Sequence, residues 1–163
     1  AVARQSAEND GYMFFMTASG GSLQERMRIN AAGQITTLSQ PSFQAQRSGS
    51  YGQSGTDNAA PYNGTKFNRG NHYSTSTYRF TAPAAGHYLF FANAHRGANN
   101  FGSIQIMKND STHYSFTEYE SFDGNAHHYT IALIDLGVND YVSVKGTNYN
   151  MDSNAFFGGY LLG

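Results

Sequence analysis

The sequence contains no cysteine and no tryptophan, only three prolines, and charged residues at 13% of its 163 positions. The absence of cysteine excludes disulfides and thiolate metal sites, and it counts against an animal secreted protein, in which disulfides are common. Ten basic residues balance eleven acidic ones without clustering, so nucleic acid is not an expected partner. No apolar run approaches the roughly 20 residues that span a bilayer, so membrane insertion is not expected. The chain lacks an initiator methionine and a signal-peptide pattern, and we expect it to be a fragment or a processed product.

Glycine and the aromatic residues Phe and Tyr are abundant, at 18 residues and 15% of the chain respectively. With frequent Asn, Ser and Thr, they predict an all-β protein with many turns. Residues 1–10 are expected to be a polar lead-in, and 11–38 a β-meander too small to be stable alone. About ten short strands from Pro41 onward predict a sandwich or jelly roll. We therefore expect a connector over residues 1–38 and a tip domain over 39–163.

Two predicted strands, Tyr88–Ala92 and Phe156–Leu162, are apolar without alternation. Such strands are typically buried on both faces. A two-layer β domain has a single inner core, so another copy of the chain is the simplest cover for the second face. The residues assigned to this core or oligomer interface are Tyr88, Phe90, Phe157, Tyr160 and Leu162.

Several ordered segments of residues 41–163 resemble the C1q globular domain. The central signature is Phe80–Phe90, with further matches at Ser42–Ala45, Asp140–Val144 and Phe157–Leu162. The resemblance implies a ten-stranded jelly roll, related to tumour necrosis factor (TNF), that assembles as a tight homotrimer. One departure from the family pattern is the segment 48–65, which is expected to be a long loop.

A second resemblance concerns the segment Glu25–Ile35, which is similar to a segment frequent in bacteriophage tail fibres. Combined with the C1q-like domain, it predicts the distal tip of a trimeric phage fibre or virion appendage that recognises a host surface glycan or protein. The alternatives are an extracellular C1q/TNF-like ligand of a cellular organism, a purely structural trimerisation cap, and a polysaccharide-cleaving tailspike. No nucleophile motif, phosphate loop or zinc signature is present, and an enzyme is not expected.

The candidate receptor-binding residues lie in loops that strand parity places at the end opposite the start of the tip domain: 48–65, 95–101, 122–127 and 147–154. Long polar loops on a rigid scaffold favour binding, whereas the turns at the other end are short. These residues are Arg96, Asn99, Asn100, Asn125, Asn148, Tyr149 and Asn150. Tyr149 is the preferred contact, with its ring stacked on a sugar and the flanking amides bonded to hydroxyls. Tyr51 and Tyr62 are further candidates, and ordinary polar loops are the alternative.

Asp123 is the one metal-binding candidate, because the resemblance places it where some C1q-like trimers hold calcium. Three-fold repetition would supply several of the six to eight oxygens that Ca²⁺ needs. The alternative is an ordinary turn aspartate before Gly124. His127 and His128 point to opposite faces of a strand and do not chelate one ion within a chain. No other cofactor is expected.

Overall fold

The computed structural model describes residues 2–7, 10–56, 59–96, 102–119 and 127–163. Contacts divide the chain into two units, Ala1–Gln40 and Pro41–Gly163. In the described residues all regular secondary structure is β-strand, as the composition predicts. The described part of the chain therefore contains no helix that is long and apolar enough to cross a membrane.

The first unit is a four-stranded antiparallel sheet. Its strands are β1 (Val2–Ala7), β2 (Asp10–Ser19), β3 (Ser22–Ile29) and β4 (Ile35–Thr36), in the order β1-β2-β3-β4. The three later strands match the predicted meander. The polar lead-in expected over residues 1–10 contains a strand that was not predicted, because β1 pairs along its whole length with β2, from Val2 opposite Phe15 to Ala7 opposite Asp10.

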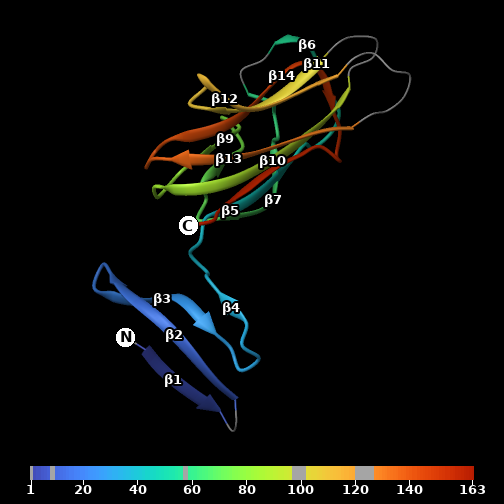
Figure 1. Ribbon diagram of the computed structural model, residues 1–163. Coiled ribbons are helices and arrows are strands. Elements are labelled where there is room, and N and C mark those ends of the chain that lie inside the picture. The colour runs from blue at the N-terminus through green and yellow to red at the C-terminus, as the bar shows by residue number, and fades with distance from the viewer. Residues whose placement is uncertain (1, 8–9, 57–58, 97–101, 120–126) are drawn as a thin grey trace. The chain divides into compact units, whose positions relative to one another are not determined.

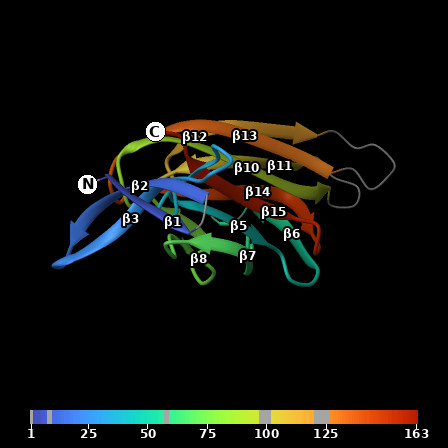
Figure 2. The same ribbon diagram turned by 90° about the horizontal axis from the view of Figure 1, so that it is seen from below.

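The second unit is a two-layered sandwich of eleven described strands (Figures 1 and 2). They are β5 (Ser42–Gln46), β6 (Tyr51–Thr56), β7 (Gly64–Arg69), β8 (Tyr73–Ser74), β9 (Arg79–Thr81), β10 (Gly86–Arg96), β11 (Gly102–Lys108), β12 (Thr112–Tyr119), β13 (His127–Leu136), β14 (Tyr141–Met151) and β15 (Phe156–Leu161). One layer has the order β7-β5-β15-β10-β13. The other consists of β12-β11-β14, with β6 and β9 also paired to β14. Ten strands were expected, and β6 is the additional one.

The core between the layers is built on aromatic rings. Phe43 lies at its centre, with ring centroids 5.1 Å from Phe80 and 5.0 Å from Phe157. Phe90 and Tyr88 complete the group, and all five side chains are at most 1% exposed. Burying each such ring contributes about 1.5–3 kcal/mol. Tyr88, Phe90 and Phe157 therefore lie in the core of one chain and do not present a face to a partner.

Gly158 and Gly159 explain why the last strand shows no alternation. A Cβ atom on Gly159 would lie 2.4 Å from the Phe90 ring, and one on Gly158 would lie 2.6 Å from the Phe91 ring. Neighbouring rings thus fill the places that side chains of β15 would occupy on the two faces. The flanking Tyr160 and Leu162 are 40% and 51% exposed, so the expected burial of both faces is not achieved within one chain.

The turns of the second unit gather at two ends, as strand parity predicts. At the base end, where this unit begins and ends, the Leu161 amide donates to Pro41 O at 3.1 Å, and the His87 amide donates to Gly163 O at 2.9 Å. The turns at 83–86, 109–111 and 137–139 adjoin this base end through bonds such as Ala82 N to Asp140 O. We call the opposite end of this unit, where β6 lies, the free end (Figure 1).

Candidate functional site

Strand β6 distinguishes the free end, because the segment 48–65 is not the long loop that was expected. It pairs with the end of β14, with Tyr51 opposite Met151 and Gly52 opposite Asn150. The expectation of a loop over 147–154 was also wrong in its first part, since β14 continues to Met151. The free end is therefore shaped by two paired strands in place of two loops.

Tyr149 is not the exposed contact that the sequence suggested. Its side chain is completely buried, with its ring 6.1 Å from that of Tyr51 and packed over Gly146, where a Cβ atom would lie 2.4 Å from the ring. Because side chains alternate along a strand, Tyr149 points inward while Asn148 and Asn150 point outward. Its ring offers no surface to a ligand, and Tyr62, a further candidate, is equally buried.

The other predicted contact residues differ in their positions and contacts. Asn148 adopts a φ of 49°, and its Oδ1 accepts a hydrogen bond from the Gly55 amide at 2.8 Å, so it fastens β6 to β14. Asn150 is half-buried and lines a recess between these strands. Arg96 ends β10 opposite Tyr149. The remaining candidates, Asn99, Asn100, Asp123 and Asn125, lie outside the described residues.

The recess at the free end has a volume of about 400 Å³ and opens to solvent. We call it the free-end recess, and its walls are formed by Ser50, Tyr51, Gly52, Asn150, Met151 and Asp152. It combines a hydroxyl, an amide and a carboxylate with one aromatic ring and a buried thioether. Sequence reasoning proposed Asn150 and Tyr51 but missed Asp152, although the polar run around it was visible.

Arg47 holds the segment that forms one wall of the recess. Its guanidinium donates to the carbonyl oxygens of Pro61 at 3.1 Å, Gly49 at 3.3 Å and Ser50 at 3.4 Å. It also lies 5.1 Å from the centre of the Tyr51 ring, within the range of a cation–π contact. The Tyr51 hydroxyl donates to Gln53 Oε1 at 2.7 Å, which fixes the direction of the ring. The backbone that forms this wall of the recess is therefore held in place by the side chain of Arg47.

A second surface covers the outside of the layer that contains β10, β13 and β15. We call it the outer apolar face, and it consists of Leu89, Phe91, Tyr129, Ile131, Leu133 and Phe156. Register places Leu89 opposite Leu133 and Phe91 opposite Ile131. The Phe156 ring lies 5.9 Å from Phe91 and 6.2 Å from Tyr129, beside a hollow of about 530 Å³. Such a surface suits contact with another protein surface.

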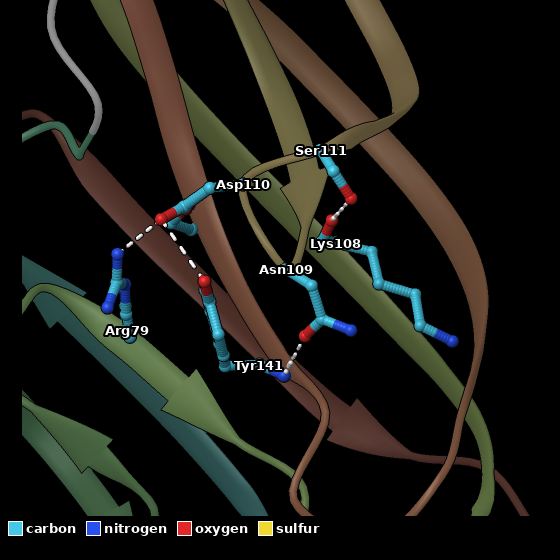
Figure 3. Close-up of polar contacts among 7 residues, drawn as sticks. Arg79, Lys108, Asn109, Asp110, Ser111 and Tyr141 are labelled. Carbon is cyan, nitrogen blue, oxygen red and sulfur yellow. Dashed lines mark hydrogen bonds and ion pairs between the residues drawn. The ribbon is translucent and has the colours of Figure 1, made fainter.

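A polar cluster ties the strands together at the base end (Figure 3). Asn109 and Asp110 have φ values of 52° and 54°, typical of the tight hairpin turn between β11 and β12. This turn directs the Asp110 carboxylate to an ion pair with Arg79 and a hydrogen bond from the Tyr141 hydroxyl at 3.2 Å. Arg79 also lies 4.3 Å from the Tyr141 ring centre. Every group in this cluster contacts another strand of the same chain. The cluster therefore stabilises the fold and is not a ligand site.

Asp140 forms a related contact beside this cluster. Its carboxylate lies 2.8 Å from Lys108 Nζ and accepts hydrogen bonds from Asn109 Nδ2 and the Gly137 amide, each at 2.8 Å. The bond from Lys108 is the largest cause that lowers the pKa of Asp140 to about 2, followed by those from Asn109 and Gly137. Asp140 is therefore ionised at neutral pH and joins the turns at 109–111 and 137–139.

The described residues contain no group of three or more His, Asp or Glu side chains placed to hold a metal ion. His127 and His128 are consecutive residues of β13, opposite His95 and Ala94 of β10, so their side chains point to opposite faces as expected.

Comparisons with known proteins agree with this geometry. The globular domain of zebrafish complement 1qA shares the fold, with a TM-score of 0.58 at 17% identity over 76% of this chain and 98% of that one. Murine APRIL gives 0.54 at 11% identity over 76% and 99% of the two chains. Eiger TNF from S. frugiperda gives 0.55 at 13% identity over 76% and 92%. No curated protein matches the chain in sequence. The family model of the C1q domain matches residues 42–162, and the chain therefore belongs to the C1q domain family.

Proposed function

We propose that this chain forms a homotrimer whose free ends bind a ligand on a cell surface. Domains of the C1q and TNF type form homotrimers, bind receptors and typically act as non-enzymatic ligand or recognition modules. The observation that carries the proposal for this chain is the outer apolar face. Tyr129, Ile131 and Leu133 are 61%, 63% and 59% exposed at alternate positions of β13, so they share one face of the strand. A contiguous apolar patch of this kind marks an interaction site on a soluble domain.

The first unit supports the same assembly. None of the residues 11–18 and 20–40 is buried, so this sheet has no core of its own among them. Register places Met13 opposite Ile29 and Phe15 opposite Met27, which gathers apolar side chains on one face. Met13 and Phe15 are 45% and 41% exposed. Copies of the same sheet in a trimer supply the cover that this face needs.

The setting that we propose is the tip of a phage tail fibre or a related virion appendage, bound to a host surface glycan or protein. It rests on the resemblance of Glu25–Ile35 to tail-fibre segments. The alternative setting is a secreted C1q/TNF-like ligand. A genomic neighbourhood that encodes capsid and baseplate proteins supports the first setting. A secretion signal followed by a collagen-like stalk in the complete gene contradicts it.

Sedimentation equilibrium of the whole chain tests the assembly. We expect the mass of three chains at micromolar concentration, and a stable monomer contradicts the proposal. Ile131→Asp should dissociate the trimer, because it places a charge where an apolar contact is expected. Burying what is now exposed of Ile131 contributes about 1–2 kcal/mol per chain, so three copies change the assembly constant by at least about 10²-fold. Val138, which is 58% exposed in the turn after β13, gives the matched control Val138→Asp, which should remain trimeric.

A further inference from the structure

We infer that the outside of the layer formed by β12, β11 and β14 carries a second binding site, for a carboxylate-bearing sugar residue of a glycan. The inference goes beyond the proposed function, because this surface lies on the layer opposite to the outer apolar face and includes no residue of the free-end recess. It starts from three side chains, Phe116, Gln105 and Lys145, which we call the amide row. Register places Phe116 of β12 and Lys145 of β14 directly opposite Gln105 of β11.

The amide row points away from the core. Ile104 and Ile106, the two neighbours of Gln105 along β11, are completely buried in the core. Because side chains alternate along a strand, Gln105 points to the opposite, outer side of the layer. Residues directly opposite each other on neighbouring strands share a face, with Cβ atoms about 4.5–5.5 Å apart. Phe116 and Lys145 therefore flank the Gln105 amide on the outside of the layer.

Gln105 carries the observation on which the inference rests. Its side chain is only 7% exposed, and its Oε1 atom is buried without a hydrogen-bond partner among the described residues. A buried acceptor without a partner destabilises a folded protein, and buried polar groups are almost always paired. This atom therefore indicates a hydrogen-bond donor that the chain itself does not supply.

The two flanking side chains bring an aromatic ring and a positive charge to the same place. Phe116 is 53% exposed, so much of its ring is open to solvent. Lys145 is half-buried, and its ammonium makes no ion pair with the described part of the chain. A lysine in this state can turn on its flexible four-carbon stem towards an anion. The row thus combines an acceptor, a ring and a cation on one small surface.

This combination fits a sugar that carries a carboxylate. The aromatic ring stacks against the C–H groups of a sugar ring, a sugar hydroxyl donates to Gln105 Oε1, and the lysine ammonium pairs with the carboxylate. A neutral sugar would leave Lys145 without an anion. An apolar peptide side chain would cover Phe116 but leave Gln105 without a donor. A simple inorganic anion would not use the ring.

Two protein carboxylates border the row, and neither faces the place of the ligand's carboxylate. Glu118 lies opposite Ser103 and belongs to β12, whereas Lys145 belongs to β14. Two strand spacings, roughly 10 Å, separate these strands, which is about the Debye length at physiological salt. Asp110 accepts a hydrogen bond from Ser143, two residues before Lys145, but its charge is offset by its ion pair with Arg79.

Saturation-transfer NMR on the whole chain tests the inference with two acidic probes, trigalacturonic acid and N-acetylneuraminic acid. The methyl ester of trigalacturonic acid is the matched neutral probe. We expect at least one acidic probe to bind with a Kd of about 1–10 mM, as suits a shallow site with few contacts. The ester should bind at least about threefold more weakly than trigalacturonic acid, because an exposed ion pair contributes modestly. Added NaCl should weaken the binding of the acids but not of the ester.

Variants of the amide row test the role of each side chain. Lys145→Gln should weaken the acidic probe about threefold, and Phe116→Ala about tenfold. Gln105→Met keeps the size of the side chain and removes the unpaired acceptor, so it should weaken binding about threefold while raising the Tm by about 2–4 °C. The matched controls lie on β7 of the other layer, where Lys66 is exposed and Phe67 is 47% exposed. Lys66→Gln and Phe67→Ala should bind normally.

The outcomes separate this inference from the proposed trimer. It is overturned if neither acidic probe binds at about 50 mM, if the ester binds as well as the acid, or if the amide-row variants bind as the β7 controls do. A lower Tm in Gln105→Met would show a purely structural amide and would also overturn it. The two acids distinguish a hexuronic acid from a sialic acid as the ligand. Ile131→Asp should keep the affinity of the single site, so a monomeric chain that binds an acidic probe refutes only the trimer.

Discussion

Replacing Gly159 with alanine should destabilise the protein, although the substitution adds only one methyl group. That methyl would lie 2.4 Å from Phe90 Cδ1 and 2.9 Å from the carbonyl oxygen of Leu89. Carbon atoms normally stand about 3.5–4.0 Å apart, so the Phe90 ring must shift by roughly 1 Å or more. The ring has no space for this shift, because it is fully buried with Phe80 and Tyr88 at centroid distances of 5.5 Å and 6.1 Å.

The expected loss is about 1–3 kcal/mol, the usual cost of overpacking a close-packed core. It exceeds the roughly 0.4–1 kcal/mol that a glycine-to-alanine change contributes by restricting the unfolded chain. A loss of 1 kcal/mol lowers the Tm of a protein of this size by about 2–4 °C, so we expect a decrease of roughly 2–12 °C.

Gly158→Ala provides an informative comparison on the opposite face of the same strand. Its methyl would lie 2.6 Å from the Phe91 ring, which is only half-buried and can turn outward. The loss of chain stability should be smaller than for Gly159→Ala. The moved Phe91 ring would disturb the outer apolar face, so assembly of the proposed trimer should weaken instead.

Urea and thermal unfolding at several protein concentrations separate these two effects, because only the assembly contribution depends on concentration. Gly137→Ala is the matched control, since its methyl would lie 3.4 Å from Asp140 Oδ2 and fits without displacement. The double variant Gly159→Ala/Phe90→Leu should recover part of the loss, because the smaller side chain makes room for the methyl. If Gly159→Ala were as stable as Gly137→Ala, the reasoning about the packed ring would be refuted.

Two further predictions concern single side chains. Tyr149→Ala should destabilise the chain by about 3–5 kcal/mol in urea unfolding, because a fully buried ring is removed, and an unchanged midpoint would contradict its burial. Asp140 has a pKa of about 2 in the folded chain against 3.8 ordinarily, so the stability that it contributes is present above about pH 4 and is lost as the pH falls towards 2. Stability measured from pH 6 to pH 2 should therefore decrease more steeply in the wild type than in Asp140→Asn, and parallel curves would exclude this role.

The strand arrangement could be predicted well from the sequence, because turn residues mark the strand ends and strand parity then assigns each turn to one end. Asn109-Asp110 and Gly137-Val138-Asn139 were identified in this way, and both lie at the base end. The C1q resemblance added what periodicity alone does not give, namely that these strands form a jelly roll.

The free end could not be predicted as well, because β6 has almost no apolar signal. Its sequence, Tyr51 to Thr56, reads as a polar loop, and it is ordered by contacts with residues far along the chain, such as Gly55 with Asn148. The same pairing extends β14 and turns Tyr149 into the interior. Local sequence alone assigns both Tyr149 and Asn150 to a loop. The pairing with β6 makes them part of a strand, in which Tyr149 faces the interior and Asn150 faces the solvent.

Strand β14 runs between the two ends of the second unit. It therefore determines whether a displacement at one end reaches the other. Near its start, Ser143 donates to Asp110 Oδ1 at 2.9 Å in the base-end cluster, and at its end Asn150 lines the recess. Between them, Val144 is buried in the core, and β14 pairs in turn with β9, β11, β6 and β10. A strand held along its whole length transmits little displacement, because close-packed interiors resist deformation. Disturbing the base-end cluster through Asp110→Asn should therefore lower the free energy of unfolding while the backbone amide NMR shifts of Asn150 and Met151 stay unchanged in the folded fraction. A change in those shifts would show that the recess is positioned by the base of the domain and not by β6.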